Sequence, residues 1–429
     1  MLKLAHGLLK LAHGLLKLAH GLLKLVHGLL KYSYERSLLW RLQITCNIPP
    51  YHYLRYYFKS MIEPEQTDLT LGFIPLTDSA PLIVAKEMGF FSQWGLNVTL
   101  QKQNSWATLR DKLHAGLLDA AQMLAPMPLA SSLGLGCAKV KVITPLVLSL
   151  NGNAITLSEK LHQEILKENN LVHVTLPLAA YLLQKVISVR KEQNHPKVRF
   201  ATVFPYSCHY YQLRDWLASA NISEADLDIV VVPPVNMVAF LQSGEIDGCC
   251  VGGPWNAKAV RAGIGLTALT SFDIWQDSPE KVLGLLASFQ QTKPNTVIAL
   301  TAGLKQACIW LESIANRFEA SRLLSSDQYL DASVDVIAPS LIGSCLTHIT
   351  MPPRAIPSYN QFSKSSSGSI NVPEYIRAEW LINQMKNAGQ LNNIEVPADL
   401  AREVFRPDIY QQMRLILEDQ AVQFYRQSG

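Results

Sequence analysis

The stretch LTLGFIPLTDSAPLIVAKEMGFF, residues 69–91, contains in succession the signals of a strand, a turn and a helix. The apolar run at 69–76 predicts a short buried strand, and the T-D-S that follows is typical of a turn. Pro81 stands near the first position of an apolar-periodic segment that extends to about Phe91, where the missing N–H of proline costs a helix nothing. This stretch therefore predicts the first half of a βαβ unit.

The same alternation continues along the chain on both sides of residue 150. Ser105 is placed to cap a helix whose Leu109, Leu113 and Leu117 share one face. Further strands are predicted at 96–100, 119–126, 139–148, 198–203, 228–233 and 248–251, and helices at 209–220, 235–243, 279–291, 296–315 and 373–388. Strands that alternate with helices indicate parallel sheets wound right-handed. We therefore predict an α/β fold of two βαβ lobes, with a ligand cleft between them and a helical C-terminal part.

The composition is that of a packed globular protein, with 48% hydrophobic and 17% charged residues. The net charge of +4 is small for 429 residues and the basic residues are spread out, which argues against a nucleic-acid-binding surface. The seven cysteines are irregularly spaced and form no C-x-x-C pair, which predicts free thiols in a reducing compartment and no metal site. No run of 18 apolar residues occurs, so no membrane span is predicted.

Residues 2–29 are four tandem heptamers, LKLAHGL three times and then LKLVHGL. A glycine in every heptamer costs a helix about 1 kcal/mol each, so we predict that residues 1–60 are an extension outside the fold and that Met61 is an alternative start. An amphipathic helix on a membrane surface is the other interpretation. Lysine, histidine and glycine interrupt every heptamer, so the segment does not resemble an export signal, and a cytoplasmic location is expected.

Several long segments, taken together, resemble one known family. They are 71–100, SWATLRDKL (105–113), AAQMLAPMPLA (120–130), LNGNAITLS (150–158), FPYSCH (204–209), 232–257 and LTSFDIWQDSPEK (269–281). In this order they resemble the nitrate- and bicarbonate-binding proteins of ABC uptake systems, and equally the cytoplasmic nitrate/nitrite sensors of the same fold. The resemblance implies the type II periplasmic-binding-protein fold. The corresponding divisions are lobe 1 at 68–155, lobe 2 at 156–285, and a helical return to lobe 1 with a tail at 286–429.

The resemblance also implies the residues around the ligand. They are Trp106, Asn153, His209, Gly252 and Lys281. Taken singly, each has an ordinary structural explanation, such as a core tryptophan or a lysine at a helix start. Together they would offer only hydrogen-bond donors and one positive charge, which suits nitrate or nitrite, whereas bicarbonate has an O–H that needs an acceptor. Lys281 therefore favours nitrate over bicarbonate, and no catalytic residue, metal or cofactor is predicted.

Two departures from the family bear on the setting of the protein. The transport proteins usually have glutamine in place of Asn153 and glutamate in place of Gly253, and the NGNAIT form at 151–156 looks more like the sensors. The resemblance then implies an RNA-binding antitermination regulator as partner. The alternative is an exported solute-binding protein at the periplasmic face of the inner membrane, working with an ABC permease on nitrate, bicarbonate or an organic sulfonate.

An enzyme of the same fold is the distant alternative. The yeast-type synthase of the thiamine pyrimidine has a cysteine-rich motif near the position of Cys249 and Cys250. Only these two adjacent cysteines are present here, flanked by Gly248 and Val251. Without the fuller cysteine cluster, the sequence predicts a binding protein and no enzymatic activity.

Overall fold

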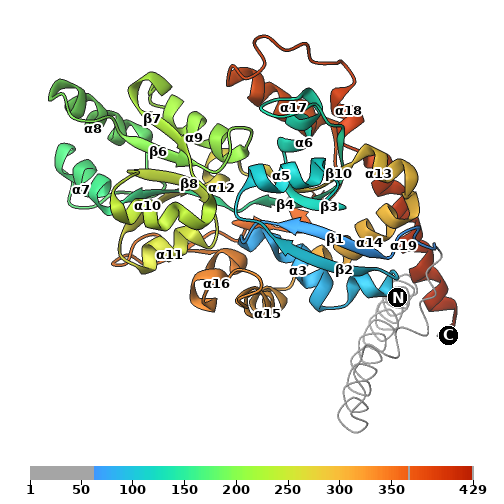
Figure 1. The fold of residues 1–429 in the computed structure, drawn as a ribbon. Coiled ribbons are helices and arrows are strands. Elements are labelled where there is room, and N and C mark those ends of the chain that lie inside the picture. Colours follow the sequence, from blue (N-terminus) through green and yellow to red (C-terminus); the bar gives the residue numbers. More distant parts are fainter. Residues whose placement is uncertain (1–61, 366–367, 428–429) are drawn as a thin grey trace, which may run out of the picture. The chain divides into compact units, whose positions relative to one another are not determined.

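The computed structural model describes residues 62–365 and 368–427, with side chains as far as Glu418. The heptamers and Cys46 lie outside the described residues, so their role stays a prediction. The described chain is organised by two mixed sheets (Figure 1), with strand orders β13-β4-β10-β3-β1-β2 and β7-β6-β8-β5-β9. We call the first sheet with its helices lobe 1 and the second lobe 2.

Lobe 1 is built on strands from three separate parts of the chain. They are β1 (Asp68–Phe73), β2 (Asn97–Lys102), β3 (Ala120–Leu124), β4 (Val142–Asn151), β10 (Pro279–Leu286) and β13 (Asn360–Gln361). β1 is parallel to β2 and β3, whereas β10 is antiparallel to both β3 and β4. The helices around this sheet are α3 (Ala80–Glu87), α4 (Phe90–Gln93), α5 (Trp106–His114), α6 (Met127–Leu133), α13 (Ala287–Thr292), α14 (Pro294–Trp310), α15 (Ile314–Leu324), α16 (Val334–Ile342), α17 (Tyr375–Asn387), α18 (Leu400–Val404) and α19 (Pro407–Gln427).

Both faces of the lobe 1 sheet are buried. Side chains of α3, α14 and α19 cover one face, and those of α5, α6, α17 and α18 cover the other. Val282 of β10 points into one of these cores and Leu283 into the other, as the two-residue period of a strand requires. The sequence of a strand that is buried on both faces is an unbroken run of apolar residues.

Lobe 2 is built on five strands and the helices between them. The strands are β5 (Asn153–Ser158), β6 (Arg199–Thr202), β7 (Asp228–Val231), β8 (Gly248–Gly252) and β9 (Gly265–Thr270). The helices are α7 (Glu159–Glu168), α8 (Ala180–Glu192), α9 (Cys208–Ala218), α10 (Met237–Ser243), α11 (Trp255–Arg261) and α12 (Ser271–Trp275). β6 is parallel to β7 and β8, and β5 is antiparallel to β8 and β9.

Local signals in the sequence predicted several element ends. The Ser105 side chain accepts a hydrogen bond from the Thr108 N–H at the start of α5, and a proline occupies the first turn of α3, both as predicted. The helix predicted to reach Phe91 instead ends at Glu87 and resumes at Phe90, because Gly89 takes the left-handed conformation with φ 73°.

The helix predicted at 279–291 is wrong over most of its length. Residues 279–286 form β10, the strand between β3 and β4, and only 287–292 are helical. The run VLGLLA has no polar positions that would separate a strand buried on both faces from a buried helix. The unpredicted strands β5 and β9 also make the lobe 2 sheet mixed rather than parallel.

The chain passes between the two lobes at places displaced from the predicted boundaries. The chain leaves lobe 1 at Gly152, so residues 153–155 belong to lobe 2 and not to lobe 1. β10 returns to lobe 1 at Pro279, so residues 279–285 belong to lobe 1 and not to lobe 2. Backbone turns with positive φ mark both passages, at Gly152 (φ 98°) and at Gln276 (φ 60°). A Cβ at position 152 would lie 2.5 Å from Asn360 Oδ1, which explains why this passage needs a glycine.

A later segment also reaches from lobe 1 to lobe 2. After α16, strands β11 (Ser344–Cys345) and β12 (Arg354–Ala355) pair antiparallel, and we call residues 344–355 the bridging hairpin. The Thr267 N–H of β9 donates to Thr347 O at 2.8 Å, and Arg354 forms an ion pair with Asp273 at 2.7 Å. The remaining short elements are β14 (Lys364–Ser365), β15 (Gly368–Ser369), and the 3-10 helices at Thr77–Ser79, Glu224–Asp226 and Pro234–Asn236.

Two sequence predictions concern thiols and membrane spans. The six cysteines in the described part of the chain are free thiols, as predicted. Over the same residues no single helix has the length and apolar character to cross a membrane; α14 and α15 meet that test only as a pair, bent by 116°.

Candidate functional site

The five residues predicted to surround a ligand lie at the interface between the two lobes. Trp106 begins α5 and Lys281 is in β10, both in lobe 1, whereas Asn153, His209 and Gly252 stand at element ends of lobe 2. The four side chains are 0% exposed. Lys281 Nζ lies 5.6 Å from the Trp106 ring centroid, and a Cβ built on Gly252 would lie 3.6 Å from Asn153 Oδ1. The structure therefore brings residues that are up to 175 positions apart (106 to 281) into one buried cluster.

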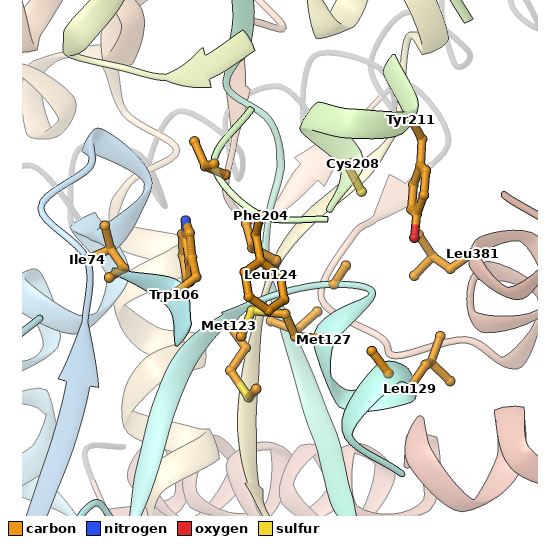
Figure 2. Close-up of a cluster of buried hydrophobic side chains, with 14 of the residues drawn as sticks. Ile74, Trp106, Met123, Leu124, Met127, Leu129, Phe204, Cys208, Tyr211 and Leu381 are labelled. Atoms are coloured by element: carbon orange, nitrogen blue, oxygen red, sulfur yellow. The ribbon is translucent and has the colours of Figure 1, made fainter. Parts of the chain in front are cut away.

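Direct contacts close the two lobes over this cluster. The Thr77 N–H donates to Gly253 O at 2.8 Å, and Cys208 Sγ donates to Pro279 O at 3.1 Å. Figure 2 shows one apolar core that includes Trp106 and Met123 of lobe 1 as well as Phe204 and Tyr211 of lobe 2. A Cβ at position 253 would lie 2.8 Å from both Thr77 Oγ1 and Ser340 Oγ, so the glutamate usual in the transport proteins does not fit this packing.

Two carboxylates that the sequence analysis missed complete the cluster. Lys281 Nζ lies 2.7 Å from Asp78 Oδ2 and 2.9 Å from Glu280 Oε1, and all three groups are buried. Gln122 orients Asp78 by donating from Nε2 to Oδ1 at 2.8 Å. A buried ammonium requires such a counter-charge, and that requirement is the signal that could have pointed to Asp78 in the T-D-S turn and to Glu280 beside the lysine.

The expectation of a site that offers only donors is therefore wrong. Burial raises the pKa of Asp78 and of Glu280, because it penalises the charged carboxylate. Burial works to lower the pKa of Lys281, but the two carboxylates outweigh it and hold that pKa above its usual value. The positive charge of Lys281 is thus already compensated by carboxylates within the protein. Lys281 therefore does not by itself favour nitrate over bicarbonate.

Several buried polar atoms of the cluster have no hydrogen-bond partner within the described residues. They are Trp106 Nε1, Asn153 Oδ1, both ring nitrogens of His209, and Glu280 Oε2. His209 Nδ1 lies 3.3 Å from Glu280 Oε1 without the alignment of a hydrogen bond. Leaving a buried polar atom unpaired costs about 1–3 kcal/mol. A concentration of such atoms at one interface is therefore expected where a small polar ligand supplies the missing partners.

The remaining polar groups of the cluster are tied down by the protein. Asn153 Nδ2 donates to Gln212 Oε1 at 3.1 Å, and Gln212 Nε2 donates to Ser278 Oγ at 3.2 Å. The ring of Trp106 packs in the core, and its indole nitrogen lies at the end of the ring away from Met123 (Figure 2). The unpaired atoms are thus held in place by rigid neighbours, as a preorganised site requires.

His209 predicts a pH dependence of stability. Burial, and then the neighbouring Lys281, lower the pKa of His209 well below 6.5. As the pH falls below about 6.5, the unfolded chain takes up a proton at this residue and the folded chain does not, so the native state loses up to about 1.4 kcal/mol per pH unit. We expect urea unfolding at pH 7, 6 and 5 to show a smaller loss for His209→Gln than for the wild type.

The exposed His195 provides the control for that measurement. The raised pKa values of Asp78 and Glu280 act in the opposite sense, because their contribution is present at low pH and lost as the pH rises. The contribution of His209 is therefore obtained only from the difference in the pH dependence of stability between the His209→Gln and His195→Gln variants. The assignment fails if His209→Gln and His195→Gln follow the wild type with the same slope.

Two mixed sheets joined by passages of the chain, with a buried polar cluster at their interface, define a two-lobed α/β protein of the type II periplasmic-binding-protein fold. Residues 62–325 match the NMT1-like family, and the chain belongs to that family.

Among known proteins, the chain is 36% identical over 349 residues to the nitrate import ATP-binding protein NrtC of Synechocystis, covering 81% of this chain and 50% of that protein. It is also 36% identical over 276 residues to the bicarbonate transport ATP-binding protein CmpC of Synechocystis, covering 64% of this chain and 39% of the relative. The chain thus spans half or less of the length of these two relatives. The crystal structure of the periplasmic nitrate-binding protein NrtA from Synechocystis matches with a TM-score of 0.75 at 27% identity, covering 83% of this chain and 91% of that one.

Proposed function

We propose that this chain binds a small inorganic oxyanion, nitrate or nitrite in the first place, in the cluster at the lobe interface. The observation that carries this proposal is the pair of unpaired donors, Trp106 Nε1 and the single N–H of the neutral His209 imidazole, beside the ammonium of Lys281. Nitrate has three acceptor oxygens and no proton, so it would accept from these groups. The similarity to nitrate-binding NrtA and to nitrate-import NrtC supports the choice of ligand.

Bicarbonate is the second candidate, and a specific observation favours it. Glu280 Oε2 and Asn153 Oδ1 are buried acceptors without a partner among the described residues. The O–H of bicarbonate would donate to such an acceptor, whereas nitrate has no proton to give. The similarity to the bicarbonate transport protein CmpC is in keeping with this alternative. Glu280→Gln should therefore weaken bicarbonate binding more than nitrate binding.

We propose that this chain is a binding subunit or domain of an ABC uptake system and has no catalytic activity. The relatives above are transport components by name, which supports this setting over that of a sensor. The antitermination regulator expected as a partner finds no such support. A cytoplasmic location is carried forward as a proposal, and fractionation of native cells tests it. Recovery of the protein in the periplasm, or on the outer side of the inner membrane, would replace it with the exported alternative.

Calorimetry of the full chain against nitrate, nitrite and bicarbonate tests which anion binds. The pH dependence of the measured affinity tests how the charge of the bound anion is compensated. Two ionised carboxylates and one ammonium already sum to one negative charge, so a bound anion favours protonation of one carboxyl. The raised pKa values of Asp78 and Glu280 lower the cost of that step. We expect nitrate affinity to fall as the pH rises from 6 to 8, by at most about tenfold per pH unit.

The same titration in buffers of different ionisation enthalpy measures the proton uptake directly. Glu280→Gln removes one of the two groups that can take the proton and should reduce the uptake. The proposed function would be overturned if the full chain bound none of the three anions. If nitrate bound with the same affinity from pH 6 to 8, protonation of Asp78 or Glu280 on binding would be excluded, while the proposed ligand would stand.

A further inference from the structure

A second group of chemically active side chains lies between α7 of lobe 2 and the bridging hairpin, apart from the cluster around Lys281. Glu159 and His162 stand one turn apart at the start of α7, and His348 comes from the bridging hairpin. His348 Nε2 lies 3.0 Å from Glu159 Oε2, and His162 Nδ1 lies 3.4 Å from the same oxygen. One ligand atom from each residue lies within 4.8 Å of the other two. No metal site was predicted from the cysteine spacing, and His348 is 189 positions from Glu159, which no local motif would connect.

The backbone around these three residues is held by hydrogen bonds at both ends. Ser158 caps α7 by accepting from the Leu161 N–H at 3.2 Å, and the Glu159 N–H donates to Ile264 O at 2.9 Å. On the hairpin, Thr347 O accepts from β9, and the Met351 N–H donates to His348 O at 3.1 Å in a turn. The two imidazoles lie edge to face with centroids 5.3 Å apart. The three side chains are therefore presented by fixed backbone rather than by free loops.

The side chains are also oriented individually. Gln163 Nε2 donates to Glu159 Oε1 at 2.6 Å, which leaves Oε2 facing both histidines. His348 Nδ1 lies 2.8 Å from Thr350 Oγ1. The Thr350 N–H also donates to Nδ1 at 3.3 Å, so without a metal the proton of His348 is on Nε2 and faces Glu159. When Nε2 gives its lone pair to a metal, the proton moves to Nδ1 and the Thr350 hydroxyl accepts it. Such an outer partner is the usual support of a metal-bound histidine.

We propose that Glu159, His162 and His348 bind a divalent zinc ion that ties the bridging hairpin to α7. Two imidazoles and one carboxylate are a donor set that zinc takes with a fourth position left for water. Ligand atoms at about 2.0–2.1 Å from a tetrahedral zinc are about 3.3 Å apart. Two of the three spacings, 3.4 Å and 3.0 Å around Glu159 Oε2, are close to that edge, and the ligand nitrogens of the two histidines lie within 4.8 Å of each other. The side chains of His162 and His348 are 7% and 12% exposed, which limits competition from water.

Zinc binding to the metal-stripped full chain tests this site. Equilibrium dialysis with zinc chloride should show one more tightly bound equivalent for the wild type than for His348→Ala, His162→Ala or Glu159→Gln. Loss of an outer partner of a metal ligand costs about 10–100-fold in affinity. We therefore expect Thr350→Val to weaken zinc at this site about tenfold, and loss of either histidine to weaken it at least 100-fold. Cobalt in the same site should give the intense visible absorption of tetrahedral coordination, and His348→Ala should abolish it.

Comparison between variants of the full chain controls for other histidines. His6, His13, His20 and His27 of the heptamers are present in every variant, so any zinc they hold cancels in the difference. His173→Ala, which removes an exposed histidine of lobe 2, should bind zinc as the wild type does. Circular dichroism identifies any variant that fails to fold, and Glu159→Gln and Thr350→Val keep the side-chain volume. Equal zinc binding by the wild type, Glu159→Gln and His348→Ala would overturn the proposal, as would a wild type that binds no tight equivalent.

Discussion

Lys281→Met is expected to abolish measurable anion binding and to lower the free energy of unfolding by about 3–5 kcal/mol. The ammonium of Lys281 compensates two buried carboxylates at 2.7 Å and 2.9 Å, and removing it leaves both unpaired inside the protein. An anion would then enter a cluster of like charge. Because burial already raises the pKa of Asp78 and Glu280, protonation should reduce the penalty, and the loss of stability should be smaller at pH 5 than at pH 8. Urea unfolding at both pH values and nitrate calorimetry measure these effects.

Two further variants separate the loss of stability from the loss of binding. Glu280→Gln combined with Lys281→Met removes one of the stranded carboxylates and should recover part of the stability without recovering nitrate binding. Lys185→Met replaces an exposed lysine of lobe 2 and should behave as the wild type in both assays. A Lys281→Met protein that is as stable as the wild type at pH 8 would contradict the charge compensation described for this cluster.

Arg317→Met is expected to lower the free energy of unfolding by about 3–5 kcal/mol through a different cause. The guanidinium of Arg317 is buried and donates to three backbone carbonyls, those of Leu311 at 2.7 Å, Leu341 at 3.0 Å and Asn360 at 2.9 Å. These carbonyls stand after α14, at the end of α16 and in β13, so one side chain joins three segments around the start of the bridging hairpin. Methionine fills a similar volume but donates nothing, which leaves the three carbonyls without this donor. Thermal and urea unfolding measure the loss.

Arg322 provides a matched control on the same helix. Both arginines belong to α15 and both lie over a phenylalanine, Arg317 over Phe362 and Arg322 over Phe318. The Arg322 side chain is 62% exposed and its pair with Glu319 is 3.7 Å long, so Arg322→Met should cost less than about 1 kcal/mol. Equal losses for the two variants would mean that stacking on the ring, rather than donation to buried carbonyls, is what Arg317 contributes.

Local sequence determined the type of fold and most of its elements. The strand at Asp68–Phe73, the turn after it and the helix that begins at Ala80 follow from apolar runs, the T-D-S sequence and a proline at a helix start, because these signals act over a few residues. The Ser105 cap belongs to the same class, since its hydrogen bond to the Thr108 N–H is made three residues away. The resemblance of several long segments to one family also named five residues that the structure brings into a single buried cluster.

Only the tertiary structure determined which distant charged groups meet and which segments lie side by side. Asp78 faces Lys281 only because β10 lies beside β3 while the T-D-S turn ends at the lobe interface, and no local pattern encodes that meeting, whereas Glu280 is the chain neighbour of Lys281. Residues 282–286 of the VLGLLA run form a strand because both faces of their sheet are covered, which depends on neighbouring elements and not on the run itself. Likewise, His348 reaches Glu159 from 189 positions away. Patterns in sequence report which residues prefer burial or a turn, whereas the pairing of distant buried charges depends on which elements the fold places side by side.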